Sequence, residues 1–415
     1  MRKNYMTAPT IKDKTLSVTD MSSITGFALN ESVGREISPS LKLKSLSATC
    51  PSKIIKMYNI FERIFVYAED GVLYEFNNGL FRDVKMTNEI PLLTGIVIAG
   101  KREVLVQTSV ETFIVGGQSQ TSGYIPKGDY SAVYKGKLFV ADKNKVYFGG
   151  PFSFDGYSFN LDNYGFIGMP IESGTIKGLT VYCDALLIFT TSAIYKLTLL
   201  ESVDYLVEKV NTPALAVVDG TCTAVGDAVY FISGNRLARY KSGSVSFISS
   251  SILSNYFSIK GQSAKANGKY ILPVFFYEHG VQCAYCYDAN FGTEQAVSIN
   301  SCAICDGGIV ADDGFNTLFL LSEDGIINHF AYWGSKVFDF GYATNKVVSQ
   351  VSVCIDKSAR LIVKGDFGRL EYLLEKGRCV KRLNLCSKTF EFEIIVDDGT
   401  FSVEDFKLKY RTTEN

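Results

Sequence analysis

The 415-residue sequence has very few of the side chains on which most catalytic and metal sites depend. It contains two histidines, His279 and His329, and a single tryptophan. Histidine is the usual acid–base group near neutral pH and a frequent metal ligand, so this scarcity argues against histidine-based catalysis and histidine-rich metal sites. Nucleophile-elbow, P-loop and dinucleotide-binding motifs are also missing from the sequence. We therefore expect no catalytic residues, no cofactor and no enzymatic activity.

An excess of charge and long apolar runs are missing as well. The 42 Lys and Arg residues are balanced by 43 Asp and Glu. A free-standing nucleic-acid-binding protein needs many uncompensated cations, so we expect at most weak, non-specific contact with DNA. The longest apolar run, Tyr270–Tyr277, has eight residues, whereas a transmembrane helix needs about 20. The polar segment 1–23 lacks the apolar core of a signal peptide, so neither a membrane segment nor a signal peptide is expected.

The sequence is rich in residues that fit β-strands. It has 29 Phe and 24 Tyr, and Val, Ile and Thr dominate the stretches between turn residues. Asp-Gly and Asn-Gly dipeptides recur, as at Asp70, Asn78 and Asn267, and they tolerate the positive φ angles of two-residue hairpin turns. No helical periodicity extends beyond two turns. The sequence therefore predicts an all-β fold in which helices are rare.

A two-strand unit recurs with a spacing of 34 to 48 residues. Each unit has a run of three apolar residues, a turn, and a second apolar run within about a dozen residues. Short strands at a period of about 40 residues are typical of a β-propeller, in which each repeat forms one four-stranded blade. We predict a β-propeller of six or seven blades; an irregular pair of β-sandwiches with accidental spacing is the alternative. The first runs start at Ile64, Val104, Leu138, Leu186, Val229, Tyr270 and Leu318.

Two segments lie outside this repeat. Residues 1–50 are rich in Ser, Thr and Lys and predict an extended arm that can add a closing strand to the last blade. The propeller is expected over residues 51–334. Residues 335–415 predict a small C-terminal β-sandwich domain that serves for attachment, because several strands follow one another closely. The expected strands are Val347–Ile355, Arg360–Lys364, Arg369–Leu374, Phe390–Val396 and Phe406–Tyr410.

Four of the ten cysteines form the pattern that comes closest to a metal site. Cys283 and Cys286 make one Cys-x-x-Cys pair and Cys302 and Cys305 make another, with a separation typical of a four-cysteine zinc site. However, Cys283 and Cys286 fall in a predicted strand, where residues three apart point to opposite faces. We predict that these residues are reduced core thiols and bind no metal; a zinc site is the alternative.

A basic cluster in the C-terminal region is a candidate contact site. Its side chains suit a phosphate group or an acidic neighbour, and the simpler interpretation is a solvated loop or a subunit contact. The charges of this region are denser than those of the propeller strands, which favours a partly polar subunit contact. The cluster consists of Lys376, Arg378, Lys381 and Arg382.

The segment 143–159 resembles a blade of a known group of virion proteins. A strand ending in Val146-Tyr147-Phe148 is followed by Pro151 and, about six residues later, by Tyr157. This arrangement is similar to the packaged-DNA stabilisation, or tail-nozzle, proteins of tailed bacteriophages and prophages. The segment 333–341 resembles the start of a final sandwich in related prophage structural proteins, and Phe406–Tyr410 resembles its end. The resemblance covers most of the chain, although the first fifty residues match poorly.

The resemblance implies a structural protein of the virion without catalytic residues. It implies a propeller that forms a homo-oligomeric ring at the portal vertex or tail, as a head–tail connector, in contact with other phage portal and tail proteins. Such a protein is made in the cytoplasm of the bacterial host and helps to retain and conduct the packaged genome. The net charge of −1 agrees with this role, because every phosphate contact adds affinity and friction to moving DNA.

Two other functions stay open. The first is a virion propeller that binds a glycan or a protein on the host surface, with Tyr157 and Phe159 as candidate partner contacts that stack on sugars. The second is a cellular scaffold of the WD type. It ranks last, because the Gly-His and Trp-Asp dipeptides of that family are missing and Trp333 is followed by glycine.

Overall fold

The computed structural model describes residues 41–98, 100–116, 119–120, 127–151, 165–200, 205–248, 257–277, 281–290, 294–312, 316–322, 331–334, 345–396 and 403–412. Within them the fold is all-β, as the sequence predicts, and the one helix is the 3-10 turn η2 (Ile171–Ser173). In this part of the chain no helix is long and apolar enough to cross a membrane. The chain divides into two compact units, of which the larger spans Leu43–Asn290 and Ile299–Gly325.

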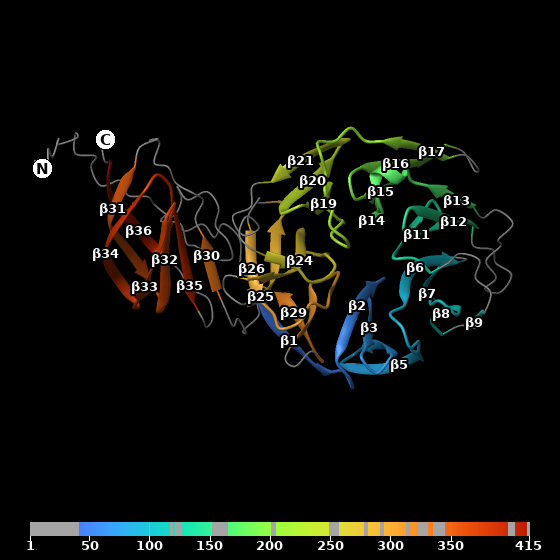
Figure 1. Cartoon of the computed structure of the whole chain (residues 1–415). Helices are drawn as coiled ribbons and strands as arrows, with labels where there is room; N and C mark the ends of the chain where they lie inside the picture. Colours follow the sequence, from blue (N-terminus) through green and yellow to red (C-terminus); the bar gives the residue numbers. More distant parts are fainter. Residues whose placement is uncertain are drawn as a thin grey trace, which may run out of the picture. The chain divides into compact units, whose positions relative to one another are not determined.

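The larger unit is a succession of antiparallel sheets arranged around a common centre, which is a propeller-like architecture (Figure 1). Most strands that are neighbours in the chain are also neighbours in a sheet, and two-residue turns connect several of them, such as β2 to β3 and β4 to β5. The first two sheets contain β2 (Ile54–Ile60), β3 (Arg63–Ala68), β4 (Val72–Asn77) and β5 (Leu80–Met86), then β6 (Leu92–Ile98), β7 (Lys101–Gln107), β8 (Thr112–Ile114) and β9 (Ser119–Gln120). The third and fourth contain β10 (Tyr130–Tyr134), β11 (Lys137–Asp142), β12 (Lys145–Pro151) and β13 (Gly165–Gly168), then β14 (Ile176–Tyr182), β15 (Ala185–Thr190), β16 (Ile194–Leu199) and β17 (Tyr205–Lys209).

The remaining sheets of the larger unit continue this order along the chain. The fifth contains β18 (Thr223–Val225), β19 (Ala228–Ser233), β20 (Arg236–Lys241) and β21 (Ser244–Ile248). The sixth is built on β22 (Phe257–Ile259), β23 (Ala264–Ala266), β24 (Lys269–Phe276) and β25 (Val281–Asp288), and β26 (Glu294–Ser298) follows along the chain. The seventh contains β27 (Ile304–Cys305), β28 (Ile309–Asp312), β29 (Thr317–Ser322) and β1 (Lys42–Thr49).

The circle of sheets is closed by a strand from the N-terminal side. β1 pairs with β29, and the innermost strands β2 and β27 of the first and last sheets contact each other. One apolar cluster spans this junction, with Met57 and Val66 from the first sheet and Leu318 from the last. The closing strand that the sequence suggested is therefore present. It lies within the segment 1–50, from which the sequence suggested that it comes.

Both faces of the first four sheets are buried against neighbouring sheets. Along β15, Leu186 and Ile188 belong to a cluster shared with the third sheet, whereas Leu187 belongs to a cluster shared with the fifth. The same alternation holds in β7, where Leu105 packs toward the third sheet. This confirms the prediction that the middle residue of an apolar triplet faces opposite to its two neighbours, and it explains why these strands read as continuous apolar runs.

The predicted triplets mark the second strand of each sheet except the last. The seventh triplet, which starts at Leu318, lies in β29, the third strand of its sheet. The equivalent second strand is β28, which starts at Ile309, about 40 residues after the start of β24. The expected partner run at residues 326–330 lies outside the described residues.

The smaller unit has two antiparallel sheets. Phe392 from the first sheet contacts Phe406 from the second, with ring centroids 5.6 Å apart, and both rings are buried. The first sheet has the strand order β30 (Ala331–Gly334), β35 (Phe390–Val396), β32 (Ala359–Gly365) and β33 (Gly368–Leu374), and the second has β34 (Gly377–Ser387), β31 (Lys346–Ile355) and β36 (Val403–Thr412).

Two predictions for this unit are wrong. β30 pairs with β35, so the boundary predicted after residue 334 comes too late and Trp333 lies in a sheet of the smaller unit. The solvated loop is wrong for three of the four basic residues, because Arg378, Lys381 and Arg382 lie in the 11-residue strand β34 (Gly377–Ser387). The alternative, a subunit contact, stays a prediction. The charged side chains of β34 obscured a strand pattern in which every second residue from Arg378 to Cys386 is exposed. Charge on an edge strand discourages pairing with other chains, so such a composition is compatible with a strand.

Candidate functional site

The first strands of the sheets enclose a cavity at the centre of the larger unit. β2, β6 and β14 lie toward the middle of the ring in Figure 1, and neighbouring first strands contact one another. We call the space between them the axial cavity; its volume is about 450 Å³. Six charged residues line it: Lys56, Lys127, Asp129, Lys143, Lys177 and Asp219.

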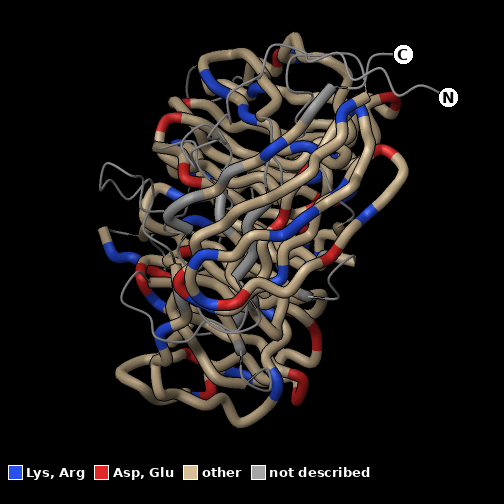
Figure 2. The backbone as a smooth tube through the Cα atoms, turned by 90° about the vertical axis from the view of Figure 1, so that its left-hand side faces the viewer, with Lys and Arg blue, Asp and Glu red and all other residues tan. Residues whose placement is uncertain are grey.

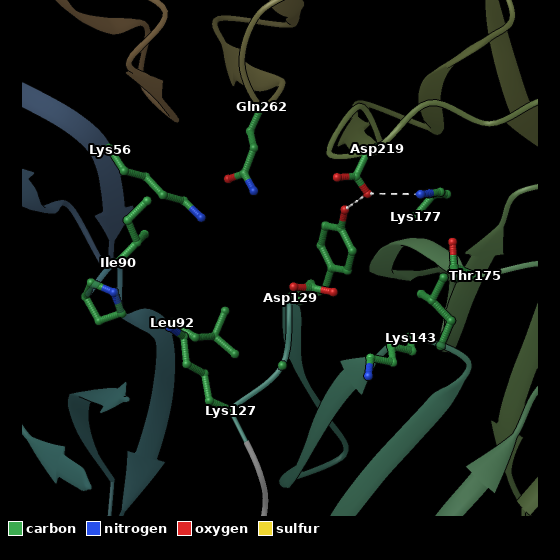
Figure 3. Close-up of a pocket in the computed structure, with 14 residues that line it drawn as sticks. Lys56, Ile90, Leu92, Lys127, Asp129, Lys143, Thr175, Lys177, Asp219 and Gln262 are labelled. Carbon is green, nitrogen blue, oxygen red and sulfur yellow. Dashed lines mark hydrogen bonds and ion pairs between the residues drawn. The ribbon is translucent and has the colours of Figure 1, made fainter. Parts of the chain in front are cut away.

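One wall of the axial cavity is a hydrogen-bonded network that joins three sheets. The hydroxyl of Tyr130, at the start of β10, donates to the carboxylate of Asp219, which precedes β18. The same hydroxyl accepts the N–H of Gly220 at 3.1 Å. Lys177 Nζ, from β14, lies 3.8 Å from Asp219 Oδ1 (Figure 3). Burial and the bond to Asp219 raise the pKa of Tyr130 well above its usual value, so this phenol stays protonated and serves as a donor.

On the opposite side, Lys56 extends from β2 toward the middle of the cavity (Figure 3). Its Nζ lies 5.2 Å from the ring centroid of Tyr58, whose hydroxyl donates to the carbonyl of Pro91 at 2.5 Å. This hydrogen bond holds the ring of Tyr58 beside the ammonium group of Lys56. Among the described residues Lys56 makes no ion pair. Lys127, the other lysine on this side, lies 3.3 Å from Glu89 Oε2.

The axial cavity offers binding chemistry rather than catalytic chemistry. Its lining combines ammonium groups, two carboxylates, a phenol, the amide of Gln262 and the hydroxyl of Thr175. A cavity of this size with a few convergent polar groups is typical of a small-molecule site. Sequence reasoning missed it, because its lysines are far apart in the chain and each looks like an ordinary surface residue.

The structure places three of the four residues of the basic cluster on one strand of the smaller unit. Arg378 and Arg382 lie on the exposed face of β34 together with Val380, which is 52% exposed. Lys381 points to the other face, and Lys376 lies in the turn that precedes the strand. No residue of this cluster shares a sheet with a lysine of the axial cavity.

The other predicted contacts, Tyr157 and Phe159, lie outside the described residues.

The four cysteines of the zinc-like pattern are in the larger unit. Cys283 and Cys286 lie on β25, which confirms the predicted strand, and both are buried. Cys305 is also buried, on β27, whereas Cys302 is half-buried. Burial raises the pKa of the Cys286 thiol to about 12 and that of Cys283 further, which disfavours the thiolate form that a metal requires. That these thiols bind no metal remains a prediction.

No protein-family profile matches the chain, and neither does any curated protein. Among solved structures, the extracellular domain of the hybrid two component system BT4673 from B. thetaiotaomicron is similar with a TM-score of 0.48 and 11% identity. That match covers 80% of this chain but only 46% of the other. The WD40 domain of Neurospora crassa Pan2 has a TM-score of 0.42 at 10% identity and 67% and 91% coverage of this chain and of that chain. BamB from Moraxella catarrhalis has a TM-score of 0.40 at 9% identity, with 71% and 97% coverage. These neighbours are propeller-like, and at such scores they say nothing about what this chain does.

Proposed function

We propose that this chain is a structural virion protein of a tailed bacteriophage. In this proposal the sheets of the larger unit are seven blades of one propeller, and the smaller unit is a β-sandwich that attaches the propeller to its neighbours. The protein assembles as a homo-oligomeric ring in the portal-vertex or tail assembly, where it helps to retain and conduct the packaged genome. The resemblance of segment 143–159 to tail-nozzle proteins, and of segment 333–341 to related prophage structural proteins, supports this placement.

The observation that carries the proposal furthest is the composition of β34. This edge strand presents Arg378, Val380 and Arg382 on one exposed face of a unit that packs separately from the propeller. An apolar side chain between two arginines is suited to a partly polar protein contact, since arginine is enriched at interfaces. In the view of Figure 2, Lys and Arg residues are interspersed with Asp and Glu residues.

A genome conduit, in this proposal, is formed between subunits and not through one of them. The axial cavity, at about 450 Å³, is within the size range of small-ligand sites, about 300–1,000 Å³. Duplex DNA does not fit there, because its major groove alone is about 12 Å wide. A ring with a near-neutral inner surface would hold DNA weakly and let it slide.

The test is the double variant Arg378→Glu/Arg382→Glu. We expect it to fold normally but to be excluded from particles when it complements a phage that lacks the wild-type gene. The matched control is Lys101→Glu/Lys209→Glu, which changes the charge equally at two exposed positions of the propeller. Normal incorporation of the β34 variant, or a monomer instead of a ring in native mass spectrometry of the wild type, would refute the proposal.

The second candidate is attachment to a glycan or protein on the host surface. The exposed Phe166, which is 55% exposed on β13, favours it, because this ring lies beside Tyr147 with centroids 6.0 Å apart. Paired rings of this kind can stack on a sugar face. Saturable binding on a glycan array that is lost in Phe166→Ala would replace the structural role by this one.

A further inference from the structure

We propose that the axial cavity is a binding site for a small anion, held chiefly by Lys56 with support from Lys143. The ligand class is a compound that carries a phosphate or carboxylate group and fits a cavity of about 450 Å³. This site is independent of the observation that carries the virion proposal. That proposal depends on β34 in the smaller unit, whereas every residue that forms the site belongs to the larger unit.

The first argument is the placement of Lys56. Its side chain is half-buried and extends into the axial cavity from one side (Figure 3). The ring of Tyr58 lies beside its ammonium group and is fixed by the bond to Pro91. An ammonium group that is withdrawn from solvent without a carboxylate partner in the described chain lacks a counter-charge that a ligand can supply.

The second argument is the repulsion between ammonium groups in the cavity. Burial lowers the pKa of Lys56 from its usual value, and the charge of Lys127 lowers it further, while Asp129 and Asp219 act in the opposite direction. Lys56 and Lys127 line the same cavity. An anion bound at Lys56 relieves both effects, because it replaces lost hydration and offsets the repulsion.

The third argument is the balance of charges that face the cavity. Lys177 and Asp219 are engaged with each other, and Lys127 is engaged with Glu89 just outside the lining. Lys56 and Lys143 then face a single carboxylate, that of Asp129, so the remaining charge is positive. Among the described residues no group of three or more His, Cys, Asp or Glu is placed to hold a metal ion. The cavity is therefore better suited to an anion than to a cation.

The hydrogen-bonding groups around the cavity complete the site. Gln262 points its amide toward the middle of the cavity in Figure 3, and Thr175 lies on the side of Lys143 and Lys177. Amide and hydroxyl donors fix the orientation of a phosphate or carboxylate after charge has attracted it. Asp129 repels a bound anion and so lowers the affinity of the site. Removing the charge of Lys56 and removing that of Asp129 should therefore change the affinity in opposite directions.

The experiment is isothermal titration of the full chain with pyrophosphate and, separately, with citrate. These probes separate phosphate from carboxylate chemistry, and saturable one-to-one binding of either supports the proposal. Lys56→Gln should weaken binding at least about tenfold, and Lys143→Gln, at an exposed position where folding is not at risk, should weaken it severalfold. Asp129→Asn should tighten it severalfold.

The matched control is Lys101→Gln, which removes an exposed lysine outside the cavity and should leave binding unchanged. Absence of saturable binding of both probes would overturn the proposal, and so would equal weakening by Lys56→Gln and Lys101→Gln or weaker binding by Asp129→Asn. Incorporation of Lys56→Gln into particles is measured in parallel. Because the virion proposal depends on β34 and not on Lys56, failure of one proposal leaves the other standing.

Discussion

The buried ion pair between Lys269 and Asp288 allows a quantitative test of how the sixth sheet is stabilised. Lys269 begins β24 and Asp288 ends β25, and the two residues are directly opposite in the antiparallel register. Their side chains are 5% and 3% exposed, and the ammonium group of Lys269 donates to Asp288 Oδ2. The other carboxylate oxygen, Oδ1, accepts the N–H of Asn290 at 2.9 Å.

Asp288→Asn preserves the shape of the side chain and an acceptor for Asn290 but removes the negative charge. Because it leaves the buried ammonium of Lys269 without its counter-charge, we expect the free energy of unfolding to fall by about 3–5 kcal/mol. The double variant Lys269→Met/Asp288→Asn removes both charges and should recover most of this loss. The coupling between the two sites in this double-mutant cycle measures how much of the cost is uncompensated charge.

The assay is urea unfolding of the single and double variants, followed by circular dichroism. The control is Lys241→Met, which breaks the ion pair of Lys241 with Asp227, where the side chains are 44% and 75% exposed. An exposed pair is screened by water, so this control should change stability little. If Asp288→Asn were no more harmful than Lys241→Met, or if the double variant were as unstable as the single one, the reasoning from burial would be refuted.

Three further predictions address other parts of the structure. Gly128→Ala should lower the unfolding midpoint strongly, because the added Cβ would lie 2.2 Å from the carbonyl oxygen of Ala141, whereas Gly168→Ala, with open space around it, should be neutral in the same thermal scan. Hydrogen bonds from the Thr389 hydroxyl and neighbouring N–H groups lower the pKa of Asp366 from 3.8 to about 2. The contribution of Asp366 to the free energy of unfolding is therefore complete above about pH 4 and is lost as the pH falls toward 2. In acid unfolding, Asp366→Asn should lack this pH-dependent loss of stability. Deletion of residues 326–415 should leave a soluble propeller that unfolds cooperatively but no longer enters particles, and aggregation of the truncated chain in light scattering would show that those strands belong to the propeller core.

The hairpin turns show how far local sequence rules reach. Asn78-Gly79 and Asn267-Gly268 have positive φ at both positions, as their dipeptides predict. Phe61-Glu62, between β2 and β3, has the same conformation with φ of 53° and 67°, although neither residue favours it. The pairing of the flanking strands imposes this turn, and no dipeptide rule would have located it.

The missed strand β34 has a similar physical origin. A sequence pattern identifies a strand when one face is apolar, but on β34 the inward residues Cys379, Lys381 and Leu385 are only half-buried. An edge strand next to solvent needs little apolar surface, so its composition is close to that of a loop. β30 is also an edge strand, and its partner β35 lies about 60 residues further along the chain, so no local pattern relates the two.

The sequence by itself determined the all-β class, the period of about 40 residues and most of the strands. These features depend on interactions between residues that are near in the chain, such as alternating burial along a strand and two-residue turns. Only the tertiary structure decided how the circle of sheets closes, with β1 paired to β29, and only it brought Lys56, Lys127 and Lys143 to one cavity. The physical reason is that ring closure and the axial cavity depend on where whole sheets pack, and the contacts that decide this packing join residues that no local pattern relates.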